Sequence, residues 1–249
     1  MISGEQMDKE ILKELVLPRH IGFIMDGNGR WAQKRNLERS EGHKAGAQAF
    51  RRICDYASEL GIEAVTFYAF STENWKRPQK EVDAIMNLFR EFLEEAQQRS
   101  DENEERGVSI RFIGDKSVLA PDLQALFEKC EKQTSSKNRT IVNLAVNYGG
   151  RAEIVRAAKR LAQKAAAGEI DPDDITEQNI SAELYTAGQP DPDLIIRPGG
   201  ENRISNFLIW QSAYSEFLFT QTLWPDFYEK DLDEAIIEFC KRNRRFGGI

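Results

Sequence analysis

The sequence predicts an α/β fold in which helices surround a largely parallel, six-stranded sheet. Short runs rich in β-branched and aromatic residues alternate with longer segments whose apolar residues recur every 3.6 positions, as in strands joined by covering helices. The 249 residues suffice for a large core, and the spacing of the elements leaves no room for a linker. We therefore expect one domain over residues 18–249, preceded by a helical or mobile extension over residues 1–17.

The individual elements follow from these local patterns. Six strands are predicted, at His20–Met25, Glu63–Phe70, Val108–Gly114, Thr140–Asn147, Asp193–Arg197 and Glu216–Thr220. Apolar residues at helical spacing predict helices around Phe50–Leu60, Leu123–Cys130, Ile154–Ala165 and Leu232–Cys240. A longer helix, Gln79 to Glu105, has apolar residues around most of its circumference. Its second apolar face either packs against a neighbour, which the pattern alone favours, or lines a cavity.

Composition excludes several classes of protein. Lys and Arg total 34 against 41 Asp and Glu, and this net charge of −7 argues against a nucleic-acid partner, so an anionic ligand requires a local cluster of arginines. The three cysteines are widely spaced, which favours reduced thiols in the cytoplasm over disulfides or a zinc site. No apolar run is long enough for a membrane span, and the N-terminus lacks the features of a secretory signal. A cytoplasmic protein is therefore expected.

A glycine-rich turn follows the first predicted strand. Its residues are Asp26, Gly27, Asn28, Gly29, Arg30 and Trp31. Glycines allow backbone N–H groups to approach an anion closely, although the same turn also occurs as a plain strand-to-helix connection. A carboxylate at the end of an apolar strand needs a cationic partner, which can be a metal or an arginine. Asp26 suits Mg²⁺ because this ion often binds one or two protein carboxylates together with substrate phosphates.

The second strand ends in a polar loop that contains two unexpected residues. Ser71, Thr72 and Asn74 can be explained as the start of the next helix. Trp75 and Arg77 cannot, and they favour a ligand-binding loop.

Arginines also gather after the fifth predicted strand. Arg197, Arg203 and Ser205 lie within nine residues, and converging guanidinium groups suit a diphosphate, although scattered surface arginines are an equal alternative from this pattern alone. Arg39 and His43 are two further candidates for donating hydrogen bonds to phosphate. Glu216, at the head of the last strand, is either a second metal ligand or the partner of an arginine.

Together these residues predict a magnesium-dependent transfer or lyase reaction on a diphosphate. Many of them can donate hydrogen bonds to phosphate, and no Ser-His-Asp arrangement or reactive cysteine is evident. An aspartate-nucleophile phosphatase would also begin with an aspartate after the first strand. It requires a second aspartate two residues later, where Asn28 stands.

Several motifs in series resemble the cis-prenyltransferases. They are His20–Trp31 (HIGFIMDGNGRW), Gly42–Gly46 (GHKAG), Tyr68–Pro78 (YAFSTENWKRP), Asn147–Gly150 (NYGG), Asp193–Phe207 (DLIIRPGGENRISNF) and Trp224–Phe227 (WPDF). The match extends from about residue 18 to Arg244–Gly248. It is strongest to the bacterial undecaprenyl diphosphate synthases, whereas the DDxxD motifs of trans-prenyltransferases are absent from the sequence.

The resemblance implies a homodimer that uses Mg²⁺ to condense farnesyl diphosphate with successive isopentenyl diphosphates. The product would be a Z-polyprenyl diphosphate such as undecaprenyl diphosphate, a cell-wall lipid carrier precursor, released with peripheral membrane contact. A non-catalytic regulatory subunit of the same fold is the alternative, but such a subunit would be expected to lack Asp26 or the arginines.

The resemblance also implies roles for individual residues. Asp26 and Glu216 would bind the metal, and Asn74 would help to remove the proton. Substrate-binding residues would be Gly27, Asn28, Gly29, Arg30, Trp31, Arg39, His43, Ser71, Thr72, Glu73, Trp75, Arg77, Arg197, Arg203, Ile204 and Ser205. The second apolar face of the long helix acquires a use in a hydrophobic tunnel, for which we expect a lining of Ala69, Ile85, Leu88, Phe89 and Ile141. Bulk at the tunnel floor, in particular Ile141, would limit product length.

Overall fold

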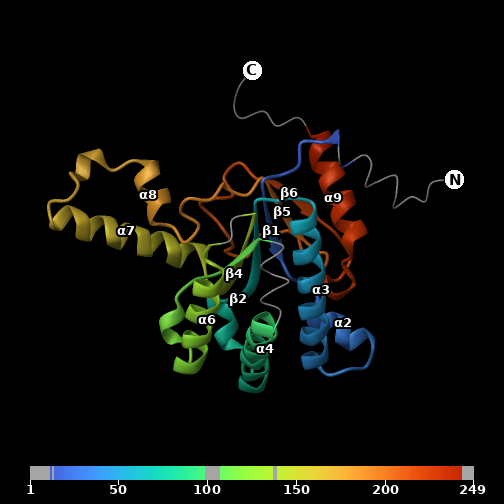
Figure 1. The fold of residues 1–249 in the computed structure, drawn as a ribbon. Helices are drawn as coiled ribbons and strands as arrows, with labels where there is room; N and C mark the ends of the chain where they lie inside the picture. The colour runs from blue at the N-terminus through green and yellow to red at the C-terminus, as the bar shows by residue number, and fades with distance from the viewer. Residues whose placement is uncertain (1–11, 13, 99–106, 137–138, 243–249) are drawn as a thin grey trace.

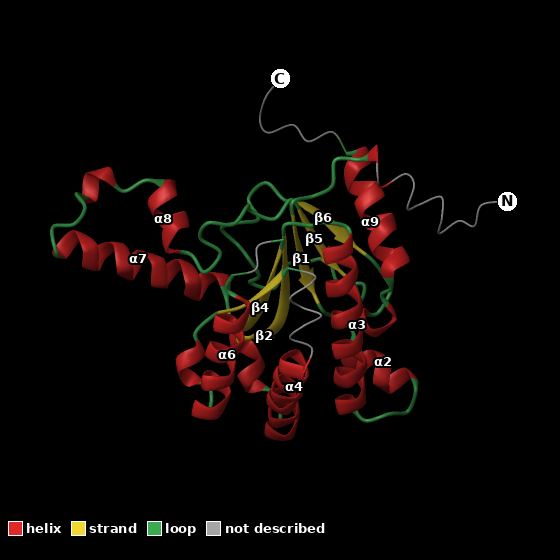
Figure 2. Ribbon diagram, viewed as in Figure 1, coloured by secondary structure: helices red, strands yellow, loops and turns green. Residues whose placement is uncertain are grey.

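A six-stranded sheet forms the centre of the computed structural model, which describes residue 12 and residues 14–98, 107–136 and 139–242 (Figure 2). All strand pairs are parallel, in the order β3-β4-β2-β1-β5-β6. The strands are β1 (His20–Ile24), β2 (Ala64–Ser71), β3 (Val108–Ile113), β4 (Thr140–Tyr148), β5 (Leu194–Arg197) and β6 (Glu216–Phe219). All six predicted strands are confirmed, and each end lies within one residue of its predicted position.

Seven helices accompany the sheet in the described part of the chain. They are α2 (Asn28–Lys34), α3 (Arg39–Glu59), α4 (Gln79–Gln98), α6 (Pro121–Thr134), α7 (Gly150–Ala166), α8 (Glu177–Glu183) and α9 (Glu229–Lys241). In Figure 1, α3, α4 and α6 lie along the sheet, whereas α7 extends away from it beside α8. The predicted extension over residues 1–17 falls mostly outside the described residues, as do residues 99–105 of the predicted long helix and the Arg244–Gly248 motif.

Both faces of the central strands are buried, which explains why these strands read as almost continuous apolar runs. All five residues of β1 are buried. On one face, β1 and β2 meet α3, α4, α6 and α9 in the larger core cluster, where the rings of Phe23 and Phe67 stack with centroids 4.8 Å apart. On the other face, Tyr68, Tyr148 and Phe207 belong to a smaller cluster. The apolar residues of α4 serve both predicted purposes, packing and lining a cavity. Val82 and Leu93 are buried in the larger cluster, and Leu88 lines a cavity.

The strand order fixes where a ligand site can form. From β1 the chain moves to β2 on one side, and after β4 it returns to β5 on the other side of β1. Ligands of open parallel sheets bind beyond the carboxyl ends of the strands, where the order reverses. The loops that follow β1 and β5 therefore meet at the expected position.

His20 gives the fold a specific pH dependence. The imidazole is fully buried, with Nδ1 2.7 Å from the carbonyl oxygen of Pro190 and Nε2 2.7 Å from Thr66 Oγ1. Burial lowers the pKa of His20 to about 4. The unfolded chain therefore binds a proton that the folded protein does not bind between pH 6.5 and pH 4. The free energy of unfolding is expected to fall by about 1 kcal/mol from pH 6 to pH 5.

Urea unfolding at a series of pH values measures this slope. The matched variant His20→Gln, which lacks a titrating group, is expected to show a shallower slope over the same interval. An unchanged slope in the variant would contradict the assignment to His20.

Candidate active site

A cavity of about 770 Å³ opens at the carboxyl ends of β1, β2 and β5, between α3 and α4. It brings together most of the side chains predicted from the sequence. Those that line it are Asp26, Gly27, Asn28, Gly29, Arg30, Arg39, His43, Ala69, Ser71, Glu73, Asn74, Arg77, Ile85, Leu88, Phe89, Arg197, Arg203 and Ser205.

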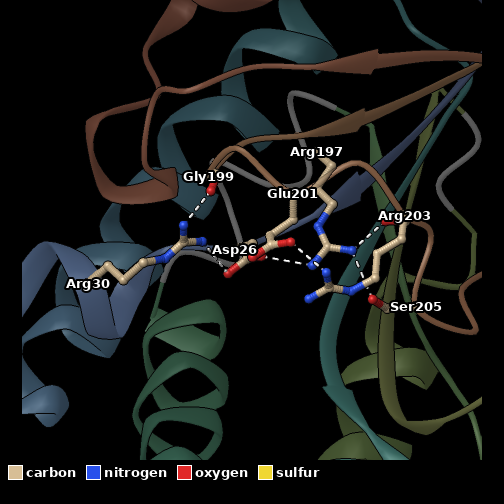
Figure 3. Close-up of polar contacts among 7 residues, drawn as sticks. All are labelled: Asp26, Arg30, Arg197, Gly199, Glu201, Arg203 and Ser205. Carbon is tan, nitrogen blue, oxygen red and sulfur yellow. Dashed lines mark hydrogen bonds and ion pairs between the residues drawn. The ribbon is translucent and has the colours of Figure 1, made fainter.

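Asp26 lies between two arginines that come from different loops (Figure 3). Its Oδ1 accepts a hydrogen bond from Arg30 Nη2 at 3.0 Å, and its Oδ2 accepts one from Arg197 Nη2 at 2.8 Å. Burial raises the pKa of Asp26, but the hydrogen bonds and positive charges of Arg197 and Arg30 outweigh that effect and hold the pKa below its ordinary value. Asp26 is therefore an ionised carboxylate at neutral pH, as a metal ligand must be.

Arg197 connects Asp26 to the turn after β5. Its side chain is almost fully buried, and Nη1 donates to Ser205 Oγ at 2.8 Å and to the carbonyl oxygen of Arg203. The guanidinium of Arg203 is mostly exposed and pairs with Glu201 at 2.5 Å. Figure 3 shows Arg197 and Arg203 on the same side of Asp26. The pair forms a cationic pocket that suits a phosphate group.

The turn after β1 owes its shape to three glycines. Gly27 has φ of 106°, a conformation in which a side chain would be strained. Gly42 and Gly46 on α3 allow Asn28 to approach closely, because a Cβ at Gly42 would lie 2.0 Å from the Asn28 carbonyl oxygen and a Cβ at Gly46 would lie 2.4 Å from Asn28 Oδ1. The close contact between α2 and α3 thus fixes Asn28 at the edge of the cavity.

Three further side chains that can donate hydrogen bonds to a phosphate converge on the carboxylate of Glu81. His43 Nε2 lies 3.2 Å from Glu81 Oε1, Arg77 Nη1 lies 3.0 Å from the same oxygen, and Arg39 Nη1 lies 3.5 Å from Oε2. Burial lowers the pKa of His43, the contact with Glu81 raises it, and the two arginines lower it, with a net decrease. His43 is therefore neutral at pH 7 and can act as a hydrogen-bond donor without a permanent charge.

The loop after β2 presents Asn74 to the cavity and turns Trp75 away from it. The loop forms a 3₁₀ turn (Thr72–Lys76), and Asn74 Oδ1 accepts a hydrogen bond from the Ser71 backbone N–H at 3.1 Å. Trp75 does not line the cavity, since its Nε1 donates to Asn147 Oδ1 at 2.8 Å and its ring contacts Phe70. Trp75 secures the loop to the end of β4.

Three other predicted substrate residues lie outside the cavity. Trp31 Nε1 donates to Asp226 Oδ1 at 2.7 Å, the ring of Trp31 supports Arg35, and Ile204 packs against the smaller core cluster. Thr72 lies close to Gly149 instead.

Glu216, predicted as a second metal ligand or as the partner of an arginine, lies outside the lining of the cavity. Glu216 begins β6 and pairs in register with Leu194, whereas Phe219 is level with Arg197 at the cavity end of the sheet. At about 3.3 Å per residue, this places Glu216 about 10 Å below the level of Arg197. Its carboxylate accepts a hydrogen bond from Arg242 at 3.0 Å, which agrees with the alternative prediction of an arginine partner.

Ile141, predicted to line the tunnel, also lies outside the lining of the cavity. Side chains alternate between the two faces of a strand, and Val142 and Leu144 of β4 belong to the larger core cluster on the α4 side. Ile141 therefore points to the opposite face, and it does not line the cavity.

Several lining residues were not predicted. They are Ile24, Met25, Gly46, Ala47, Phe50, Tyr68, Phe92, Leu144, Asn206 and Trp224. Four of them extend the apolar wall that Ile85 and Phe89 begin, namely Ala47, Phe50, Phe92 and Leu144. Phe50, Phe92 and Leu144 fell within predicted helices or strands without a predicted role in the site, and Ala47 fell outside the predicted elements. The resulting cavity has a charged mouth and an apolar interior.

The residues present fit Mg²⁺ in one way only. Among the described residues there is no group of three or more His, Cys, Asp and Glu side chains that could hold a metal ion. Asp26 supplies one carboxylate, so the other ligands would come from substrate phosphates and water, a common arrangement for this ion.

Comparison with known proteins supports the same reading. Residues 24–247 match the family model described as "Putative undecaprenyl diphosphate synthase". An "Isoprenyl transferase" of Clostridium perfringens is 47% identical over 99% of this chain and 96% of its own length. A "Ditrans,polycis-undecaprenyl-diphosphate synthase ((2E,6E)-farnesyl-diphosphate specific)" of Xanthomonas axonopodis is 48% identical over 93% of this chain and 89% of its own length.

Solved structures are also similar. The lavandulyl diphosphate synthase of Lavandula x intermedia, in complex with dimethylallyl diphosphate, superimposes with a TM-score of 0.89 at 38% identity and covers 93% of this chain and 98% of its own. A "probable undecaprenyl diphosphate synthase" of Campylobacter jejuni gives a TM-score of 0.75 at 33% identity over 94% of this chain and 100% of its own. With the shared fold, the near-complete coverage and the arginine-rich cavity, these matches show that the chain belongs to the undecaprenyl diphosphate synthase family of cis-prenyltransferases.

Proposed function

We propose that this protein condenses farnesyl diphosphate with successive isopentenyl diphosphates and releases a long Z-polyprenyl diphosphate of the undecaprenyl class. One observation carries the proposal: a single cavity joins a charged mouth, at Asp26, Arg30 and Arg197, to an apolar interior formed by residues such as Phe89 and Leu144. A substrate with a diphosphate head and a hydrocarbon tail matches both ends of this cavity.

The two diphosphates would occupy opposite sides of Asp26. The allylic diphosphate is assigned to the turn Gly27–Arg30 with Arg39 and His43, next to the apolar wall of α3 and α4. Isopentenyl diphosphate is assigned to Arg197, Arg203 and Ser205, in the pocket described above. Holding both reactants in adjacent sites accounts for much of the rate gain in a reaction of this kind.

The chain's own groups provide the remaining chemistry. Asp26 would hold Mg²⁺, which supplies charge stabilisation to the departing diphosphate. Arg30 and Arg39 would add positive charge at the same leaving group, and backbone N–H groups of the glycine turn would add hydrogen-bond donors. Asn74 lies on the loop over the cavity, where its amide can direct the proton that leaves the condensed product, either through water or to a phosphate oxygen.

The proposal also includes a homodimer in the cytoplasm that passes its product to the membrane. The family resemblance and the lipid nature of the product support this assignment. No helix in the described ranges is long and apolar enough to cross a bilayer.

The function is tested by incubating purified protein with radiolabelled isopentenyl diphosphate, Mg²⁺ and one primer at a time. The primers are farnesyl diphosphate and dimethylallyl diphosphate, and the products are resolved by length. A ladder ending near eleven isoprene units with farnesyl diphosphate supports the proposal. A single short product that forms only with dimethylallyl diphosphate, or no labelled lipid with either primer, contradicts it.

Phe92 offers a prediction about product length. A second, smaller pocket of about 50 Å³ lies behind the main cavity, and Phe50 and Phe92 line both spaces. Their rings meet edge to face with centroids 5.3 Å apart, so they form the partition. Phe92→Ala opens this partition and is expected to lengthen the longest product.

The matched control is Ile141→Ala, because Ile141 faces the opposite side of the sheet. Its product ladder is expected to equal that of the unsubstituted protein. Unchanged products from Phe92→Ala would exclude the partition as a limit on chain length.

A further inference from the structure

Asn206 occupies a strained turn between two parts of the site. It follows Ser205 in the loop after β5, and its φ is 65°, in the left-handed region. Ser205 and Leu208 also have positive φ, at 49° and 43°. Non-glycine residues adopt this conformation at a cost, and a succession of them persists only where the surrounding contacts hold them.

Those contacts come from the turn that begins α7. The carbonyl oxygen of Asn206 accepts a hydrogen bond from the Gly150 N–H at 2.7 Å, and Oδ1 accepts one from the Arg151 N–H at 2.9 Å. A Cβ at Gly149 would lie 2.7 Å from Asn206 Nδ2, so that glycine leaves space for the amide. Both oxygens of Asn206 are thus committed to backbone donors.

This arrangement determines the direction of the amide nitrogen. A backbone N–H can only donate, so the atom facing Arg151 must be the oxygen, and Nδ2 must point the other way. It donates to Glu73 Oε1 at 3.1 Å. Burial raises the pKa of Glu73, but hydrogen bonds from its own backbone and from Asn206 outweigh that effect and hold the pKa below its ordinary value, so the carboxylate is ionised at neutral pH.

The two ends of this contact belong to different functional elements. Glu73 immediately precedes Asn74 on the loop over the cavity, and Asn206 immediately follows Ser205, whose hydroxyl group binds Arg197. We propose that Asn206 is a positioning residue that couples the Asn74 loop to the arginine pocket, so that the loop is held closed over the second diphosphate. This inference rests on the site assignment proposed above.

The coupling is tested first with Asn206→Asp. The new carboxylate keeps an oxygen for the Arg151 N–H and places its other oxygen against the carboxylate of Glu73. Repulsion between the two charges is expected to displace the loop and raise KM for isopentenyl diphosphate about tenfold, since a hydrogen bond to a charged group is replaced by a like-charge contact. KM for farnesyl diphosphate is expected to stay within about twofold, because its assigned residues lie on α2 and α3.

Rescue separates positioning from a merely structural role. Adding Glu73→Gln to Asn206→Asp restores a donor and an acceptor across the gap, since the glutamine amide can donate to the introduced carboxylate. The double variant is expected to return to within about threefold of the original KM. Failure of the rescue, or an unchanged KM in Asn206→Asp, would overturn the coupling.

Asn179→Asp is the matched control. Asn179 also uses its amide oxygen to accept a backbone hydrogen bond, from Thr176, but on α8 away from the cavity. Its kinetics are expected to be unchanged.

If Asn206→Asp does not fold, Glu73→Ala removes the same contact from the loop side. It is expected to raise KM for isopentenyl diphosphate as well, and an unaltered KM in this variant overturns the proposal. Absence of turnover in the unsubstituted protein would instead contradict the proposed function.

Discussion

Asp26→Asn is expected to lower kcat at least about a hundredfold, the size of effect seen when a group that stabilises transition-state charge is removed. The substitution keeps the shape of the side chain but removes its charge. It also replaces one acceptor with an N–H donor, which then faces Arg30 or Arg197 at the present contact distances of 3.0 and 2.8 Å. Neutral asparagine is a poor Mg²⁺ ligand here, so added Mg²⁺ is not expected to restore turnover.

Stability must be measured beside activity, because the same substitution leaves a nearly buried arginine without its counterion. Removing one partner of a buried ion pair is costly, and a lower Tm is expected for Asp26→Asn. The matched control is Asp122→Asn, which removes an arginine pair outside the cavity, that of Arg90 with Asp122 at 2.8 Å. Full activity in the control and a residual kcat within tenfold in Asp26→Asn would contradict the proposed role of Asp26.

The sequence predicted the sheet closely because local information determines it. A strand buried on both faces needs an apolar side chain at nearly every position, so β1 and β2 stand out from the amphipathic helices around them. The Asp26 and Arg197 turns were also recognisable, since glycine and arginine gather within a few residues of each strand end. Parallel pairing then places such turns side by side at one edge of the sheet.

Features that depend on tertiary contacts were harder to predict. Whether Ile141 or Val142 faces α4 depends on which face of the sheet each alternate side chain of β4 occupies. Almost all residues of this strand are buried, so no regular alternation of exposed and buried positions marks the two faces. Glu216 shows the same difficulty along the strand, because its distance from Asp26 follows from the register of β5 with β6. The amide of Asn206 acquires its role only when the loop after β2 folds against the turn that begins α7.

The two glycines of α3 are expected to respond differently to alanine. At Gly42 the added Cβ would lie 2.0 Å from the carbonyl oxygen of Asn28, a backbone atom that can move away only if α2 shifts from α3. At Gly46 it would lie 2.4 Å from Oδ1 of the Asn28 side chain, which can rotate. Gly42→Ala is expected to lower the free energy of unfolding by about 3 kcal/mol, at the upper end for overpacking, and Gly46→Ala by about 1 kcal/mol.

Binding is expected to separate the two variants in a second way. Rotation of the Asn28 amide in Gly46→Ala changes the edge of the cavity that is assigned to the allylic diphosphate, so KM for farnesyl diphosphate should rise while KM for isopentenyl diphosphate stays constant. Urea unfolding measures the two stability losses, and the KM values for the two substrates measure the change in binding. Equal stability losses at Gly42 and Gly46 would mean that the side chain of Asn28 is held as firmly as its backbone, and that the turn binding the first diphosphate is rigid before the substrate arrives.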